Sequence, residues 1–452
     1  MARNRSNRRQ FLKSATATGP IVTSLPWSER PMVQSGGKPA AIGGAPVRTR
    51  PFPSWPVTDQ TEDKALLDVL HHGKWFRGDG KVVDQFEQEY ARVMGVKRCL
   101  ATANGTSALI TSLAGLGVGP GDEVIIPPYT FIATLNAVLI RYALPVFVDS
   151  DAETFQIDSR KIEAAITDRT AVIMPVHIGG SAADLKSILE IGKRRRLPVV
   201  EDACQAHYGE WEGHKLGSLG TTGCFSFQAS KNLNSGEGGA ILTNDEALAE
   251  KCFAFHNNCR PRRSSGYNFQ YMGYSGANLR MTEFQAGLLL AQMTRVERQS
   301  QTRNQNALYL TGLLEKIPGV KPARLYPGCT RSAWHLYMFR YDREKFAGLS
   351  RSQFLKALRA EGIPASGGYE PLNKEALLKD ALGSKAFRSI YPEQRLTQWG
   401  EQNRCPENDK LCQQAVWLTQ TMLLGDKNDM EQIAEAVSKI SRHAGDLLKL
   451  GE

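Results

Sequence analysis

A lysine stands between an apolar run and a glycine-rich turn, a setting that could give its amine unusual chemistry. Lys231 follows residues 224–228 (Cys-Phe-Ser-Phe-Gln) and precedes residues 236–239 (Gly-Glu-Gly-Gly). We predict that the first segment is a buried strand and that the glycines allow close approach of the backbone. Burial lowers the pKa of an amine, and a neutral amine can attack a carbonyl carbon. A lysine considered alone would be assigned to the surface, but these neighbours favour an amine that forms a Schiff base.

A carboxylate closes another predicted strand earlier in the chain. Asp202 is the last residue of the apolar run 198–202. An acid in this place could keep the pyridine nitrogen of pyridoxal phosphate (PLP) protonated, so that the ring of the cofactor accepts electrons. Considered alone, Asp202 could equally cap the turn that follows the strand. Its interpretation therefore depends on which residues lie beside it.

Two further segments follow predicted strands. Residues 104–107 (Asn-Gly-Thr-Ser) lead into a helix whose free N–H groups could bind a phosphate, although a simple capped turn explains them as well. Residues 128–131 (Pro-Tyr-Thr-Phe) supply an aromatic ring that could stack on a flat cofactor or pack in the core. Open α/β sheets bind ligands at the carboxyl ends of their strands. The four features together favour a PLP site with Lys231 and Asp202 as catalytic residues.

The pattern of apolar runs predicts an α/β fold. Amphipathic segments such as 107–116 and 184–195 separate many of the short apolar runs, which is typical of strands buried on both faces of a mostly parallel sheet. We predict seven strands, over 99–103, 123–127, 145–149, 171–176, 198–202, 224–228 and 239–243.

The pattern changes after a long predicted helix over 282–305. A strand is predicted over 334–341, a helix over 350–361 and a final helical region over 426–450. We therefore predict a large cofactor-binding domain over 36–300, which begins with an arm rich in Pro and Gly, and a smaller C-terminal α/β domain over 301–452.

Composition excludes several classes of protein. The 452 residues are 41% hydrophobic, and no run approaches the length of a membrane-spanning helix, so stable membrane insertion is not expected. Half of the net charge of +10 lies in the first 28 residues. The basic clusters 193–196 and 260–263 are too short to indicate a nucleic-acid partner. Eight cysteines include no metal-binding spacing, so no metal is expected. Cys405 and Cys412 could form a disulfide if the protein is exported.

The first 35 residues look like a separate leader. Arg8-Arg9 is followed by Phe-Leu-Lys and a weakly apolar run, which resembles a twin-arginine export signal. This route exports folded proteins, so a cofactor could be loaded in the cytoplasm. The alternative is a disordered basic tail on a cytoplasmic protein.

From about residue 45 to its end, the chain resembles the DegT-type sugar aminotransferases, which are fold-type I PLP enzymes. The motifs that carry the resemblance are residues 104–109, 128–131, 175–177, 201–207 and 225–239. The resemblance implies that Lys231 is the Schiff-base lysine and proton carrier, and that Asp202 holds the pyridine nitrogen. It also implies that Gln205 lies near the 3-hydroxyl group of PLP and that Phe131 stacks on the ring.

The resemblance assigns the phosphate group its own set of residues. Gly105, Thr106 and Ser226 match phosphate contacts of the family. Asn278 matches a residue that reaches the phosphate bound by a second subunit. A homodimer with shared active sites is thereby implied.

The resemblance also implies a reaction, ping-pong transfer of an amino group from glutamate or glutamine to a keto-sugar or keto-cyclitol. A related branch of dehydratases has histidine at the lysine position, so Lys231 favours transamination. Residues 74–78 and 258–261 look closer to enzymes of aminocyclitols or 3-amino-5-hydroxybenzoate, whereas Asn373 stands where many members have histidine.

The alternative function is a non-catalytic PLP-binding sensor. The intact Lys231, Asp202 and Gln205 argue against it. Export conflicts with a nucleotide-sugar substrate, because nucleotide sugars are cytoplasmic.

Overall fold

The structure is a computed structural model that describes residues 37–262, 270–273 and 275–449. The predicted leader over 1–35, with its paired arginines, lies outside the described residues. In the part of the chain that is described, no helix is long and apolar enough to cross a membrane.

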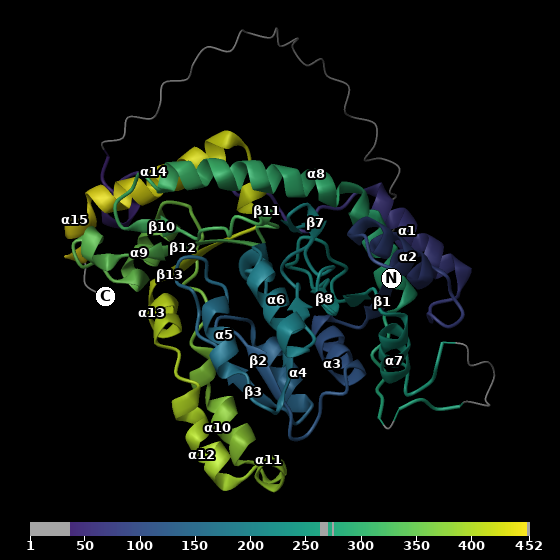
Figure 1. Ribbon diagram of the computed structural model, residues 1–452. Helices are drawn as coiled ribbons and strands as arrows, with labels where there is room; N and C mark the ends of the chain where they lie inside the picture. The colour runs from purple at the N-terminus through teal and green to yellow at the C-terminus, as the bar shows by residue number, and fades with distance from the viewer. Residues whose placement is uncertain (1–36, 263–269, 274, 450–452) are drawn as a thin grey trace, which may run out of the picture. The chain divides into compact units, whose positions relative to one another are not determined.

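A large sheet of seven strands lies between residues 98 and 243 (Figure 1). One half has the order β1-β9-β8-β5 and the other half the order β3-β2-β4, and parallel bridges from Ile173 to Val199 and from Val176 to Asp202 join the halves. Among these strands only β9 runs antiparallel to its neighbours. The strands are β1 (Arg98–Thr102), β2 (Glu123–Ile126), β3 (Leu144–Phe147), β4 (Thr170–Ile173), β5 (Val200–Asp202), β8 (Thr222–Ser226) and β9 (Gly239–Thr243). The predicted mostly parallel sheet is confirmed, with strand ends shifted by up to three residues.

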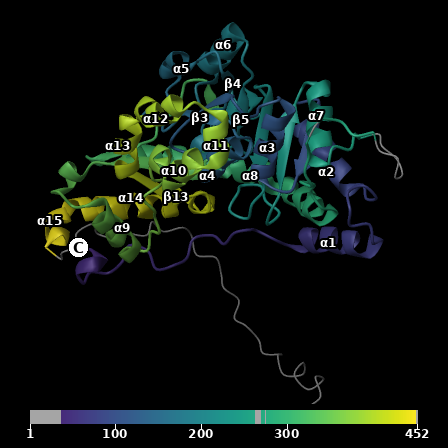
Figure 2. The same cartoon turned by 90° about the horizontal axis from the view of Figure 1, so that it is seen from below.

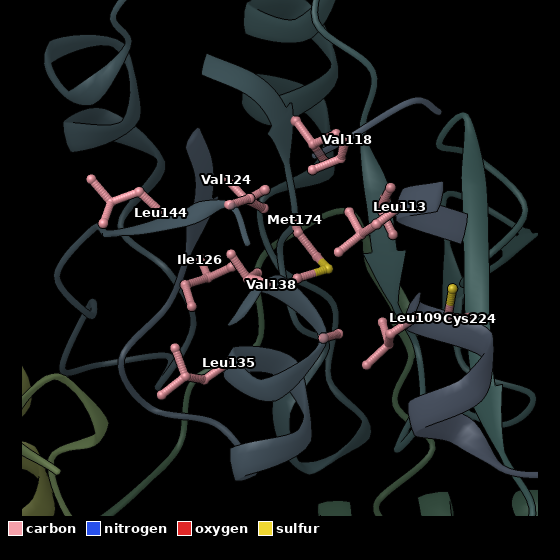
Figure 3. Packing of buried hydrophobic residues seen from close by; sticks show 14 of the residues in the cluster. Leu109, Leu113, Val118, Val124, Ile126, Leu135, Val138, Leu144, Met174 and Cys224 are labelled. Atoms are coloured by element: carbon pink, nitrogen blue, oxygen red, sulfur yellow. The ribbon is translucent and has the colours of Figure 1, made fainter. Parts of the chain in front are cut away.

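Helices cover both faces of this sheet because successive strand residues point to opposite sides. On β2, Val124 and Ile126 belong to one apolar cluster and Ile125 to another. The first cluster, drawn in Figure 3, packs α3 (Gly105–Gly115), α4 (Ile132–Ile140) and α7 (Glu246–His256) against the sheet. The opposite face is covered by α2 (Val82–Met94), α5 (Ser159–Ala165), α6 (Leu185–Arg195) and α8 (Glu283–Leu314).

A second, antiparallel sheet has the order β10-β12-β13. Its strands are β10 (Val320–Pro322), β12 (Leu336–Tyr341) and β13 (Ala415–Thr419). Side chains from α8, α9 (Arg351–Ala360), α14 (Lys427–Arg442) and α15 (Ala444–Leu448) form one apolar core with it. The predicted strand and helices of this region are confirmed, with boundaries that differ by a few residues.

Helix α8 is longer than predicted and contributes to both cores. Leu289 and Val296 pack beside the large sheet, whereas Leu310 and Leu314 pack beside the small one. The predicted boundary between residues 300 and 301 falls within this helix. The division of the chain into these two domains stays a prediction.

Four helices between β12 and β13 were not predicted. They are α10 (Ala376–Gly383), α11 (Lys385–Ile390), α12 (Glu393–Gln402) and α13 (Pro406–Gln414). Phe387 and Trp399 belong to the core cluster of the large sheet, and the indole of Trp399 donates a hydrogen bond to the Pro145 carbonyl at 2.8 Å. Figure 2 shows α12 beside β3. This segment therefore packs against the large sheet, although it lies late in the chain.

The remaining elements are short or peripheral. They are α1 (Gln60–His72), β6 (Glu210–Trp211), β7 (His214–Lys215), β11 (Cys329–Arg331) and 3-10 turns at Ala40–Ile42, Ile178–Gly180, Arg343–Phe346, Leu372–Lys374 and Met422–Leu424. All eight cysteines are free thiols, so Cys405 and Cys412 are not joined in this structure.

Candidate active site

A cavity of about 630 Å³ lies at the carboxyl ends of β1, β2, β5 and β8. Seven of the eight predicted site residues line it, namely Gly105, Thr106, Phe131, Asp202, Gln205, Ser226 and Lys231. The eighth, Asn278, is exposed and forms an antiparallel bridge with Asn257 instead. The structure thus brings together four segments that are far apart in the sequence, as expected for an open α/β sheet.

Lys231 lies in the loop between β8 and β9. The loop is held by backbone hydrogen bonds, including one from the Lys231 N–H to the Gln228 carbonyl at 2.8 Å. Burial lowers the pKa of the Lys231 amine, and this effect is partly offset by the nearby Cys204 and Asp202. None of the described residues forms a hydrogen bond or ion pair with its Nζ atom. The amine therefore lines the cavity and loses its proton more readily than an exposed lysine does.

The glycine-rich turn allows close approach of the backbone, as predicted. The two segments that approach each other are the start of β9 and the residues just after β1. A Cβ atom on Gly239 would lie 2.4 Å from the carbonyl oxygen of Asn104. Gly236 has a φ of 83°, which favours glycine. These glycines therefore bring the lysine loop against the start of α3.

The carboxylate of Asp202 is buried and held in place from two sides. It accepts a hydrogen bond from the Thr134 hydroxyl at 2.8 Å and another from the Cys204 N–H at 3.2 Å. The second bond is the local turn cap that the sequence also suggested. Both bonds fix the orientation of the carboxylate, because its oxygens are committed to donors on different elements.

The N-terminus of α3 and the end of β8 form a polar corner of the cavity. The Asn104 side chain caps the helix by accepting a hydrogen bond from the Ser107 N–H at 2.8 Å. A Cβ atom on Gly105 would lie 2.6 Å from the Cβ atom of Ser226, so only glycine allows the helix to start so close to β8. The hydroxyls of Thr106 and Ser226 lie beside this helix end. Free N–H groups, the helix dipole and two hydroxyls suit a phosphate group.

The motif residues beside Asp202 have a structural role. The buried carboxylate of Glu201 accepts hydrogen bonds from His177 Nε2 at 2.8 Å and from the N–H groups of Gly217 and Gly220. Burial alone raises the pKa of Glu201, but these hydrogen bonds outweigh it and lower the pKa below its usual value. The pair therefore ties β5 to the turn before β8 and fixes the neighbouring Asp202.

Gln205 connects the cavity floor to an aromatic wall that the sequence did not reveal. Its Oε1 accepts a hydrogen bond from the Gly179 N–H at 2.8 Å, and its Nε2 donates to the Tyr369 hydroxyl at 2.9 Å. The Tyr369 ring packs edge-on against Trp417, whose indole donates to the Tyr129 hydroxyl at 2.9 Å. Burial raises the pKa of Tyr369 well above its usual value, so its hydroxyl stays protonated and can donate to a ligand.

Tyr369, Trp417 and His335 line the cavity but were not predicted as site residues. They come long after β9, the last strand of the large sheet, which ends at Thr243, and a single aromatic residue or histidine carries no local signal. Asn373, the noted departure from the family pattern, does not line the cavity in the described structure. Its amide donates to the Asn403 carbonyl at 2.9 Å, toward α13.

Residues 56–438 match the model of the DegT/DnrJ/EryC1/StrS aminotransferase family. The chain belongs to this family. It is 35% identical over 426 residues to L-glutamine:2-deoxy-scyllo-inosose aminotransferase of Streptoalloteichus tenebrarius, with 90% of this chain and 98% of the relative covered. It is 34% identical to 3-amino-5-hydroxybenzoate synthase of Amycolatopsis mediterranei, with 86% of this chain and 96% of the relative covered.

Solved structures of the family have the same fold. The crystal structure of 3-amino-5-hydroxybenzoic acid synthase has a TM-score of 0.77 and 33% identity, and covers 88% of this chain and all of that one. An aminotransferase from Psychrobacter cryohalolentis also has a TM-score of 0.77, with 28% identity and coverage of 87% of this chain and 100% of that chain. This DegT-type chain is thus a PLP-dependent aminotransferase, and the non-catalytic sensor considered above finds no support in these relatives.

The residues that line the cavity fit PLP at both ends of the cofactor. A shielded amine faces the cavity, a fixed carboxylate lies at the end of β5, and a helix N-terminus with two hydroxyls forms a corner for an anion. Phe131 is 56% exposed at the start of α4 and offers its ring to the cavity. Among the residues that the structure describes, no group of three His, Cys, Asp or Glu side chains could hold a metal ion.

Proposed function

We propose that this aminotransferase moves an amino group from L-glutamine to a keto-cyclitol. The proposal is supported by the cavity that combines Lys231 and Asp202, and by relatives named as L-glutamine:2-deoxy-scyllo-inosose aminotransferases that match nine tenths of the chain. Bound PLP supplies an aldehyde that takes the amino group and a ring that accepts electrons when the Cα–H bond breaks.

Each residue of the cavity has a defined role in this proposal. The Lys231 amine would hold the cofactor until the donor takes its place, and the freed amine would move the proton from the Cα atom of the donor to the carbon of the former aldehyde group. The Asp202 carboxylate keeps the pyridine nitrogen protonated. Gly105, Thr106 and Ser226 hold the phosphate group, Phe131 covers the ring, and Gln205 orients the 3-hydroxyl group.

A substrate panel tests the reaction. Purified enzyme should transfer amino groups from L-glutamine to a keto-cyclitol such as 2-deoxy-scyllo-inosose, and more slowly or not at all to a nucleotide-linked keto-sugar. L-glutamate in place of L-glutamine serves as the donor comparison. Transfer to the nucleotide-linked sugar alone would contradict the cyclitol assignment.

Removal of the lysine amine should abolish both cofactor attachment and turnover. In Lys231→Ala, we expect no visible absorption band of lysine-bound cofactor and a loss of activity of at least roughly a thousandfold, since the nucleophile and the proton carrier are lost together. Absorption spectroscopy and the transfer assay measure the two effects. Lys215→Ala, a lysine paired with Glu210 outside the cavity, is the control and should keep both.

We propose further that the enzyme is a homodimer in which Asn278 completes the phosphate site of the partner subunit. Asn278 is exposed and lies outside the cavity of its own chain. Near it, the half-exposed ring of Phe76 lies 5.2 Å from the guanidinium of Arg280. An exposed aromatic residue beside a family phosphate contact suits a surface that a second subunit covers.

Mixed dimers test the shared site. Asn278→Ala and Lys231→Ala should each be inactive or nearly so, but a dimer of one subunit of each kind has one intact site. An equimolar mixture exchanged under mild denaturant should recover roughly a quarter of wild-type activity. Recovery of none, with dimers present by light scattering, would show that Asn278 acts within its own chain.

We also propose that the leader exports the folded holoenzyme by the twin-arginine route. The paired Arg8 and Arg9 and the Phe-Leu-Lys that follows support this proposal. A free cyclitol substrate removes the conflict that a cytoplasmic nucleotide sugar would create. Fractionation of cells should find the wild type outside the cytoplasm and the Arg8→Lys/Arg9→Lys variant within it. If the two proteins are distributed in the same way, the leader is a basic tail and not an export signal.

A further inference from the structure

A histidine in the wall of the cavity lies near the catalytic amine. His335 immediately precedes β12 and lines the cavity together with Lys231. Its side chain is largely buried, with 7% of the residue exposed. It lies next to a strand of the small sheet, whereas Lys231 lies in a loop between two strands of the large sheet.

A neighbouring amide determines which nitrogen of the ring carries the proton. The Nδ2 group of Asn232 donates a hydrogen bond to the Ala333 carbonyl at 2.7 Å. The Oδ1 atom of the same side chain then faces His335 Nδ1, at 3.2 Å. Since a carbonyl oxygen can only accept, Nδ1 carries the hydrogen and Nε2 keeps a lone pair. No described residue is hydrogen-bonded to Nε2.

The surroundings keep this ring neutral. Burial lowers the pKa of His335 well below its usual value, and the charges that Lys231, His207 and Arg303 carry when protonated lower it further. These groups come from the lysine loop, from the turn after β5 and from α8, and the cavity that His335 lines also contains the titratable side chains of Asp202, Cys204, Glu237 and Tyr369. A neutral ring keeps Nε2 as an acceptor at physiological pH.

We propose that His335 is a positioning residue, which accepts a hydrogen bond from the freed Lys231 amine through Nε2 while Asn232 holds the ring in that orientation. The proposal rests on the proposed function, because this amine is freed only when an amino donor displaces it during turnover. An amine that donates one hydrogen to Nε2 has its rotation restricted. Its lone pair can then stay directed at the Cα proton of the donor.

Nuclear magnetic resonance of the apoenzyme tests the ring orientation without reference to activity. In ¹⁵N-labelled apoenzyme, the His335 signals are identified by their absence in His335→Gln, among only eight histidines. We expect a neutral ring protonated at Nδ1 that does not titrate between about pH 5 and 8. A ring protonated at Nε2, or one that titrates in this range, would overturn the proposal.

Two substitutions at His335 separate positioning from packing. The donor half-reaction is followed as the loss of the visible band of lysine-bound cofactor after L-glutamine is added. His335→Phe should slow it by roughly a hundredfold, because the acceptor is lost. His335→Gln keeps an acceptor oxygen and should retain the rate within roughly tenfold. Equal rates in both variants and the wild type would refute the role.

A charge placed opposite Nδ1 provides a pH signature that a structural role would not produce. In Asn232→Asp, a carboxylate should raise the pKa of His335, protonate Nε2 and remove the acceptor at low pH. The pH–rate profile of the half-reaction should then gain a new acidic limb, that is, a loss of rate at low pH. Asn234→Asp is the matched control, because Asn234 is buried in the same loop but its amide donates to the Lys231 carbonyl at 3.3 Å. The same limb in both variants would contradict the assignment to His335.

Failure of the proposed function is distinguishable from failure of this inference. If the wild type reacts with neither L-glutamine nor L-glutamate, the donor assignment fails, whereas the tautomer of His335 in the apoenzyme is still measured. If the donor reacts normally in His335→Phe, the reaction assignment stands and the positioning role is wrong.

Discussion

Asp202 is the last residue of β5 and Lys231 follows the neighbouring strand β8, and the charge of the carboxylate acts on the amine. Burial lowers the pKa of Lys231, and the carboxylate of Asp202 acts in the opposite direction. Two opposing effects at one atom give a prediction with a definite sign. The amine must be neutral to attack the cofactor, so the pH dependence of cofactor binding reports its pKa.

We expect the rate of PLP binding to the apoenzyme to rise with pH and to level off below 10.5, the ordinary pKa of a lysine amine. In Asp202→Asn the negative charge is lost, so the plateau should begin at a lower pH than in the wild type. Stopped-flow absorption between roughly pH 6 and 11 measures both curves. A plateau that moves to higher pH in the variant would show that the carboxylate does not act on the amine as proposed.

At the scale of elements, the phosphate corner depends on how closely α3 approaches β8. Gly105 begins the helix in contact with Ser226, and Gly239 of β9 lies against the carbonyl of Asn104. Three elements therefore meet through backbone and small side chains. Any added atom must move the helix end away from the strand.

Gly105→Ala should weaken PLP binding by at least roughly tenfold, because its Cβ atom would lie 2.6 Å from the Ser226 Cβ atom. Gly400→Ala is the control: Gly400 lies in α12, and its Cβ atom would meet no atom within 4 Å. Better helix propensity should stabilise that variant by about 0.5–1 kcal/mol and leave PLP affinity unchanged. Fluorescence titration and urea unfolding measure the two properties; wild-type affinity in Gly105→Ala would contradict the tight contact.

At the scale of the whole molecule, one buried acid connects the N-terminal arm to the C-terminal helices. Glu361, which caps the end of α9, accepts hydrogen bonds from the N–H groups of Ala40 and Val47 at 2.8 and 2.9 Å. It also pairs with the ammonium group of Lys439 on α14 at 3.0 Å. The arm therefore belongs structurally to the far end of the chain.

Glu361→Ala should destabilise the protein by about 3–5 kcal/mol, since it leaves Lys439 buried without its partner and two backbone N–H groups without an acceptor. Glu344→Ala removes an acid whose side chain is 81% exposed and should change stability by less than about 0.5 kcal/mol. Urea unfolding followed by tryptophan fluorescence compares the two variants. Equal stability would mean that the arm is not held by Glu361.

Residue patterns alone predicted the seven strands, the order of the site segments along the chain, and Lys231 and Asp202 as residues of the cavity, whereas Gln205 and Ser226 came from the family resemblance. These features depend on local patterns: short apolar runs define buried strands, and a polar residue after each strand lies at one edge of the sheet. The resemblance to a family then indicated what those residues do.

The distant residues that complete the site become visible only in the folded protein. Tyr369, His335 and Trp417 reach the cavity from the small sheet and its loops, and α10 to α13 return to the core of the large sheet. A single aromatic residue or histidine has no periodicity, and the partner of an amphipathic helix is not encoded in its own pattern. The contacts that complete the cavity around Lys231 and Asp202, such as those of Gln205 with Tyr369 and of Asn232 with His335, therefore arise from packing between segments a hundred or more residues apart, which local sequence cannot specify.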